Sequence, residues 1–167
     1  MRYLGIDLGR ARIGVWDRGL PAPGESVYSV RQNLQPLVLN GQPTAASGDP
    51  ALWGATLRGS AYVARSSIGQ DAAGDLIYAA SMSALPADLA AALAGHGARI
   101  AMELDINPEW VQLDAARRPG GTLTAEIPGQ YRPPGQYLAG WTRDFVTILA
   151  PPASSPGIPP PAARLRP

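Results

Sequence analysis

Several residue types are scarce or missing in this chain of 167 residues, and each absence argues against a class of function. There is no cysteine, so the chain can form no disulfide and has no thiolate for catalysis or metal binding. All 14 basic residues are arginine, and 13 acidic residues nearly balance them, which leaves a net charge of +1. That charge gives no electrostatic attraction for nucleic acid, so we expect no nucleic-acid partner.

Histidine and long apolar runs are also in short supply. The single histidine, His96, cannot build a histidine-rich metal site, and we expect neither a metal nor a cofactor. No apolar run is long enough to cross a bilayer, so we expect no membrane insertion. Residues 1–14 lack the continuous apolar core and the cleavage site of a signal peptide.

What the chain does contain is a series of short strand patterns. Residues 3–20 have strand-like side chains with a glycine near the middle, which suits a hairpin or a bent strand. Residues 62–70 and 75–81 form a second pair of strand patterns. The linker between them, Asp71-Ala72-Ala73-Gly74, predicts a hairpin turn because glycine readily adopts a positive φ.

One helix pattern stands among these strands. PADLAAALAG, residues 86–95, begins with a proline, and Leu85, Leu89 and Leu93 form an apolar stripe at helical spacing. The helix leads directly into a strand pattern at residues 98–105. We therefore expect an α+β fold with a mainly β core, in which this principal helix packs on a mixed sheet.

The remaining segments predict smaller elements and a tail. SVRQNLQPLV, residues 29–38, is compatible with a short helix before Pro36, and TRDFVTILA, residues 142–150, is a candidate for the last strand. Seven of residues 151–167 are proline. We therefore expect one domain over residues 1–149 and a disordered, proline-rich tail over 150–167.

The stretch AMELDINPEW places acidic and amide groups at alternate positions. Glu103, Asp105, Asn107 and Glu109 would project from one face of a strand, which Pro108 then ends. Such a cluster at the end of a strand is a plausible place for chemistry. The alternative interpretation is a polar strand face that runs into an Asn-Pro turn.

The order of these motifs is similar to that of a known family. RSSIG (65–69), a D-x-x-G hairpin (71–74), a leucine-alanine helix and AMELD (101–105) follow one another, with QPLVLNG (35–41) upstream. This arrangement resembles the phosphodiester glycosidase family, which includes the enzyme that uncovers mannose 6-phosphate by removing N-acetylglucosamine. The resemblance covers about residues 27–113.

The chain departs from the usual pattern of that family in three places. The family's asparagine is Glu103 here, and its glycine-rich run after the aspartate is replaced by residues 106–109, Ile-Asn-Pro-Glu. This ending is similar to that of a branch common in high-GC Gram-positive bacteria. The N-terminal Asn-Gly-Gly-Phe-Phe segment of the family is absent, so we expect residues 1–149 to lack the N-terminal part of the domain.

The resemblance implies a hydrolase that cleaves a sugar-1-phosphodiester in a cell-envelope glycan. It implies that Arg65 holds the phosphate and that Asp105 is catalytic, with Glu103 as a second carboxyl group. Asn107 would contact a sugar hydroxyl, and Trp110 would form a wall of the site. It also implies secretion or a location in the cell envelope.

Each of these roles has a structural alternative. Arg65 is equally suited to binding loop carbonyls, Asn107 to forming a turn and Trp110 to filling the core. A protein with these structural roles would be a non-catalytic relative that keeps the fold and binds envelope glycans. We expect the two functions to be distinguished by whether Arg65 and Asp105 converge on one open pocket.

Overall fold

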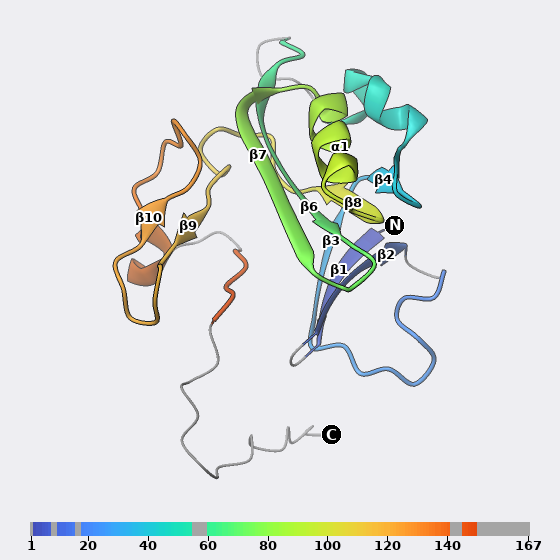
Figure 1. Ribbon diagram of the computed structural model, residues 1–167, viewed down its shortest axis with the longest axis horizontal. Helices are drawn as coiled ribbons and strands as arrows, with labels where there is room; N and C mark the ends of the chain where they lie inside the picture. Colours follow the sequence, from blue (N-terminus) through green and yellow to red (C-terminus); the bar gives the residue numbers. More distant parts are fainter. Residues whose placement is uncertain (1, 8–9, 16–17, 55–59, 141–144, 150–167) are drawn as a thin grey trace.

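The computed structural model describes residues 2–7, 10–15, 18–54, 60–140 and 145–149, with only the backbone described for residues 2–7 and 10. One principal helix packs on antiparallel strands, which confirms the expected α+β fold with a mainly β core (Figure 1). Two short 3₁₀ helices, Ala45–Gly48 and Pro50–Leu52, lie between the strands and precede the central hairpin.

The central sheet has five strands in the order β5-β4-β8-β6-β7. Their bounds are Pro36–Leu39 (β4), Gln42–Pro43 (β5), Val63–Gln70 (β6), Leu76–Ala84 (β7) and Ile100–Glu103 (β8). All described pairings are antiparallel, so the expectation of a mixed sheet is wrong. The reason is that the helical connection after β7 passes over β6, and β8 therefore pairs with antiparallel β6 instead of with β7.

The helix α1, Pro86–Gly95, covers one face of this sheet, as the sequence predicts (Figure 1). Its first turn is stabilised by the Asp88 carboxylate, which accepts a hydrogen bond of 2.8 Å from the backbone N–H of Leu85. Leu89 and Leu93 are buried, and they pack in a cluster that includes Trp53. The apolar stripe thus fixes which face of α1 meets the sheet.

Three N-terminal strands form a second sheet with the order β2-β1-β3. They are β1 (Arg2–Asp7), β2 (Arg10–Val15) and β3 (Ser29–Asn33). The hairpin predicted within residues 3–20 is confirmed. The short helix predicted before Pro36 is wrong, because Ser29–Asn33 pairs with β1 and this long-range pairing outweighs local helix propensity.

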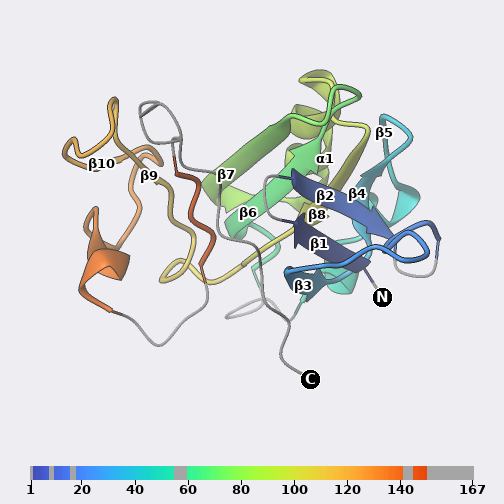
Figure 2. The ribbon, with the colours of Figure 1, turned by 90° about the horizontal axis from the view of Figure 1, so that it is seen from below.

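The N-terminal sheet lies against the face of the central sheet opposite α1 (Figure 2). Ile13 packs there with Ile68 and Met102. The side chain of Gln70 adds two bonds between the sheets: its Oε1 accepts from Ile13 N at 3.1 Å, and its Nε2 donates to Ala11 O at 2.8 Å. The central sheet is therefore covered on both faces.

Residues 111–140 form a lobe with little regular structure, which we call the C-terminal lobe. It contains the two-residue strands β9 (Asp114–Ala115) and β10 (Thr124–Ala125) and the 3₁₀ helix Gln136–Ala139. Asp114 organises it, because its carboxylate accepts bonds from Gln112, Gln130 and the backbone of Gly135. The lobe is therefore held by side-chain bonds more than by a sheet.

Two predictions concern the end of the chain. Residues 145–149 have no regular structure, so the strand predicted over 142–150 is wrong for this part, and residues 142–144 and 150 lie outside the described ranges. The predicted tail, 150–167, lies outside them as well. Within the described ranges, no helix has the length and apolar content that crossing a bilayer requires.

Candidate functional site

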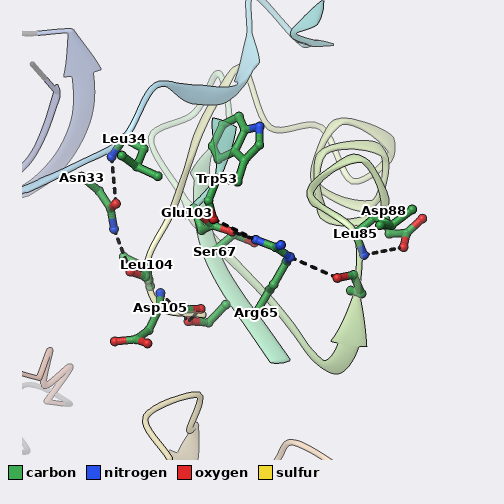
Figure 3. A network of polar contacts seen from close by, with 12 residues as sticks. Asn33, Leu34, Trp53, Arg65, Ser67, Leu85, Asp88, Glu103, Leu104 and Asp105 are labelled. Atoms are coloured by element: carbon green, nitrogen blue, oxygen red, sulfur yellow. Dashed lines mark hydrogen bonds and ion pairs between the residues drawn. The ribbon is translucent and has the colours of Figure 1, made fainter. Parts of the chain in front are cut away.

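Arg65 occupies β6, with its side chain directed beneath α1. The side chain is fully buried, with an exposed fraction of 0%. Its Nε donates to Ala84 O at 3.0 Å, and its Nη1 donates to Trp53 O at 3.3 Å (Figure 3). Arg65 therefore binds backbone carbonyls from two other segments. This is the structural role that the sequence allows for it beside phosphate binding.

Glu103 is the acidic partner of Arg65. The strand register places Glu103 on β8 opposite Ser67, and Ser67 and Arg65 share a face of β6 because they are two residues apart. Nη1 of Arg65 lies 2.7 Å from Oε1 of Glu103, whose exposed fraction is 2%. Burial raises the pKa of the Glu103 carboxyl, while the bond and charge of Arg65 act in the opposite direction.

Asp105 lies just beyond the end of β8. Its backbone continues the pairing with β6, because Asp105 O accepts from Ser66 N at 2.8 Å and Asp105 N donates to Ser66 Oγ at 3.1 Å. Its carboxylate is half-buried and points away from the Arg65 guanidinium (Figure 3). The structure thus brings Arg65 to Glu103 and leaves Asp105 in a different environment.

The turn after Asp105 is built by side-chain caps. The Asp105 carboxylate accepts from Asn107 N at 2.8 Å, and the Asn107 side-chain oxygen accepts from Glu109 N at 2.9 Å. Asn107 O then accepts from the backbone N–H groups of Trp110 and Val111. Two consecutive Asx turns therefore shape this segment, so Asp105 and Asn107 both have a local structural role.

Trp110 is half-buried at the end of this turn. Its ring contacts Arg132, which the sequence analysis does not single out. The guanidinium carbon of Arg132 lies 5.2 Å from the centroid of the Trp110 ring, and Arg132 Nη2 lies 2.5 Å from Oε2 of Glu109. The neighbouring Tyr131 is 62% exposed. The only sequence signal for these two residues is an aromatic-arginine pair before two prolines, which has no fixed spacing to the acidic motif.

Tyr78 on β7 lies near the same turn. Its hydroxyl donates to Gln112 O at 3.3 Å, so it connects the central sheet to the C-terminal lobe. Burial raises the pKa of the Tyr78 phenol to about 12, a bond with Ser66 lowers it, and the negative charge of Asp105 raises it further. Tyr78 is therefore a neutral hydrogen-bonding group at ordinary pH.

Two open grooves lie elsewhere on the described surface. The first, of about 480 Å³, runs between β7, α1 and the C-terminal lobe, and we call it the β7 groove. The second, of about 400 Å³, lies beside β2 and includes Arg12 and Arg18. Neither groove is lined by Arg65, Glu103 or Asp105. The residues proposed for catalysis therefore do not share either of these openings.

The described residues include no group of three or more histidine, aspartate or glutamate side chains placed to hold a metal ion. Comparison of the chain with family models, with curated proteins and with solved structures found no match.

Proposed function

We propose that this chain is a non-catalytic relative of the phosphodiester glycosidases that binds a cell-envelope glycan. The observation that carries this proposal is the enclosure of Arg65, whose guanidinium is bonded to Glu103 and to two backbone carbonyls and has no exposed surface. A phosphate clamp must present its guanidinium to the ligand. Arg65 instead supports the fold.

Releasing Arg65 for a ligand would be costly. The carboxylate of Glu103 would remain in a buried position without its partner, and breaking a buried ion pair typically costs about 3–5 kcal/mol. A phosphodiester bound at Arg65 would have to offset that cost as well as its own desolvation. Tight binding at this position is therefore disfavoured, whereas a surface site needs no such rearrangement.

The surface that fits a sugar best is the turn of residues 105–110 together with Tyr131 and Arg132, which we call the glycan turn. Tyr131 offers an exposed aromatic ring, and flat rings of this kind stack on the apolar faces of sugars. The half-buried Asp105 carboxylate can accept hydrogen bonds from sugar hydroxyls. Three of the residues named from the sequence, Asp105, Asn107 and Trp110, belong to this surface.

Hydrolysis remains a second candidate because one observation favours it. Unlike Glu103, Asp105 is accessible to solvent, and its negative charge acts on the nearby Tyr78. A carboxylate and a phenol in proximity are groups that can transfer protons. In this case the phosphate would have to be held by a group other than Arg65.

A binding and turnover assay with one ligand separates the two candidates. A synthetic N-acetylglucosamine-1-phosphodiester is titrated into the full chain by calorimetry, and release of the sugar is followed in parallel. We expect binding without release, and we expect Tyr131→Ala to weaken binding about tenfold, the loss typical of one aromatic stacking contact. Tyr62→Ala, at a tyrosine that is 57% exposed and lies outside the glycan turn, is the control.

Two outcomes would contradict the binding proposal. Failure to bind either this ligand or its uncharged methyl glycoside would exclude the glycan turn as a site for this sugar. Release of the sugar by the wild-type chain, abolished in Asp105→Asn with an unchanged circular dichroism spectrum, would instead establish the hydrolase.

A further inference from the structure

Gly54 and Ile106 are distant in the sequence and in contact in the structure. Gly54 has a φ of +89°, and a Cβ built on it would lie 2.6 Å from Cδ1 of Ile106 and 3.8 Å from Cγ1. Carbon atoms are in favourable contact at about 3.5–4.0 Å, so the end of the Ile106 side chain occupies the space that a side chain at position 54 would need. The bare backbone of Gly54 is thus the surface on which Ile106 packs.

The backbone at Gly54 is held in place through the residue before it. Trp53 is fully buried, and its Nε1 donates to Ala46 O at 2.7 Å. Its carbonyl oxygen accepts from Nη1 of Arg65 at 3.3 Å (Figure 3). Burial and these two bonds restrain Trp53, so the surface offered by the adjacent Gly54 is a fixed part of the protein body.

Ile106 is the residue of the glycan turn that reaches this surface. The bonds accepted by the side chains of Asp105 and Asn107 are internal to the turn, so they give it its shape without fixing its place on the body. The backbone of Asp105 is fastened to β6 through Ser66. Beyond that point the half-buried side chain of Ile106 continues the attachment.

We propose that Ile106 is a positioning residue of the glycan turn, and that its contact with Gly54 holds the Asp105 carboxylate in place for a sugar hydroxyl. This inference rests on the proposed binding of a glycan at this turn. A loop that is already ordered loses less conformational freedom when a ligand binds. The contact therefore raises affinity although Ile106 itself need not touch the sugar.

Two substitutions test the contact by complementation in the full chain. Gly54→Ala places a methyl group 2.6 Å from Cδ1 of Ile106, and we expect the displaced turn to bind the methyl glycoside of N-acetylglucosamine about tenfold more weakly. Ile106→Val removes Cδ1 and keeps the carbon at 3.8 Å. The double variant Gly54→Ala/Ile106→Val should therefore regain most of the affinity that Gly54→Ala loses.

The matched control is Gly97→Ala, which measures backbone strain without a clash. Gly97 has a φ of +92°, and a Cβ built on it would meet no atom within 4 Å. An alanine there carries the strain of a positive φ, as it does at position 54. Because Gly97 lies outside the glycan turn, this variant should bind the sugar as the wild-type chain does.

Amide exchange reports on the turn in the absence of any ligand. The backbone N–H groups of Trp110 and Val111 both donate to Asn107 O. We expect both protons to exchange at least about fivefold faster in Gly54→Ala than in the wild-type chain, because the turn opens more often. The double variant should return them towards the wild-type rate, and Gly97→Ala should leave them unchanged.

Either of two results would overturn the inference. One is a Gly54→Ala variant that behaves like Gly97→Ala in both measurements. The other is a loss in Gly54→Ala that Ile106→Val does not reverse, since strain alone cannot be relieved by shortening a neighbouring side chain. A wild-type chain that binds no sugar would contradict the proposed function instead, and the exchange rates would still decide whether Ile106 positions the turn.

Discussion

Arg65 and Glu103 form a buried ion pair across two neighbouring strands, with 2.7 Å between Nη1 and Oε1 and exposed fractions of 0% and 2%. The pair lies beneath α1 in a cluster that is otherwise mostly apolar. It joins β6 to β8, and through Trp53 O it also fixes the chain that enters the central hairpin. With the bond from Arg65 Nε to Ala84 O of β7, these two residues connect four segments of the fold.

Removing one member of this pair should destabilise the protein far more than removing both. We expect Glu103→Leu or Arg65→Met to lower the free energy of unfolding by about 3–5 kcal/mol, because each leaves a buried charge without its partner. The double variant Arg65→Met/Glu103→Leu should recover a large part of that loss. Urea denaturation of the four proteins gives the coupling energy, and additive losses would contradict the interpretation.

Gly69 is required for the close approach between the sheet and the turn that follows α1. A Cβ at this position would lie 2.8 Å from the Cβ of Ala98 and 3.3 Å from the backbone oxygen of Ile100. We therefore expect Gly69→Ala to destabilise the protein by about 1–3 kcal/mol through overpacking. Thermal unfolding provides the measurement.

The matched control for this substitution is Gly95→Ala in the last turn of α1. A Cβ on Gly95 would meet no atom within 4 Å, and alanine favours helix more than glycine does. Gly95→Ala should leave stability unchanged or raise it by up to about 1 kcal/mol. Equal losses in both variants would mean that packing against Ala98 is not the cause.

The phenol of Tyr78 should make stability fall at alkaline pH. Its pKa is raised to about 12 in the folded protein from an unfolded value of 10.0. Because the folded value is the higher one, the contribution is fully present below pH 10 and is lost as the pH rises towards 12. The loss should be of the order of 2 kcal/mol and should be absent in Tyr78→Phe.

Urea titrations at several alkaline pH values compare the wild-type chain with this variant. The ultraviolet absorbance of the phenolate is measured in both proteins, and the difference between them gives the pH at which Tyr78 ionises. A difference spectrum that appears near pH 10 would mean that Tyr78 ionises as freely as it does in the unfolded chain.

The parts of the fold that could be predicted from the sequence are those whose signals are local. The β6–β7 hairpin follows from a turn with Gly74, and α1 follows from a proline start and a leucine stripe. The alternating pattern at residues 98–105 predicts the strand after α1, which the structure has over Ile100–Glu103. In each case neighbouring residues alone determine the conformation.

The errors arise where distant segments decide the outcome. Residues 29–33 have no strong local preference, and pairing with β1 makes them a strand. The antiparallel sheet depends on β8 entering beside β6, which no local pattern encodes. Residues 145–149 have the composition of a strand, but in the described part of the chain they have no partner.

The candidate site was predictable only in part for the same reason. Strand alternation predicts one shared face for Glu103, Asp105, Asn107 and Glu109, which is wrong because β8 ends at Glu103 and the chain turns from Asp105 onward. The register that brings Glu103 to Arg65 comes from the pairing of β6 with β8. The stacking of Arg132 on Trp110 depends on how the C-terminal lobe folds back, over a region in which many bonds involve a side chain.

The amide of Gln70 has a further consequence for how the protein fluctuates. Its oxygen accepts from Ile13 N and its nitrogen donates to Ala11 O, which are the bonds that a peptide group of a neighbouring strand would make. Here a single side chain makes both. Beside it, the bond from Asn33 Nδ2 to Leu104 O and the packing of Ile13 on Ile68 and Met102 also join the two sheets. Because both bonds come from one side chain, they are lost together whenever the first three strands move away from Gln70.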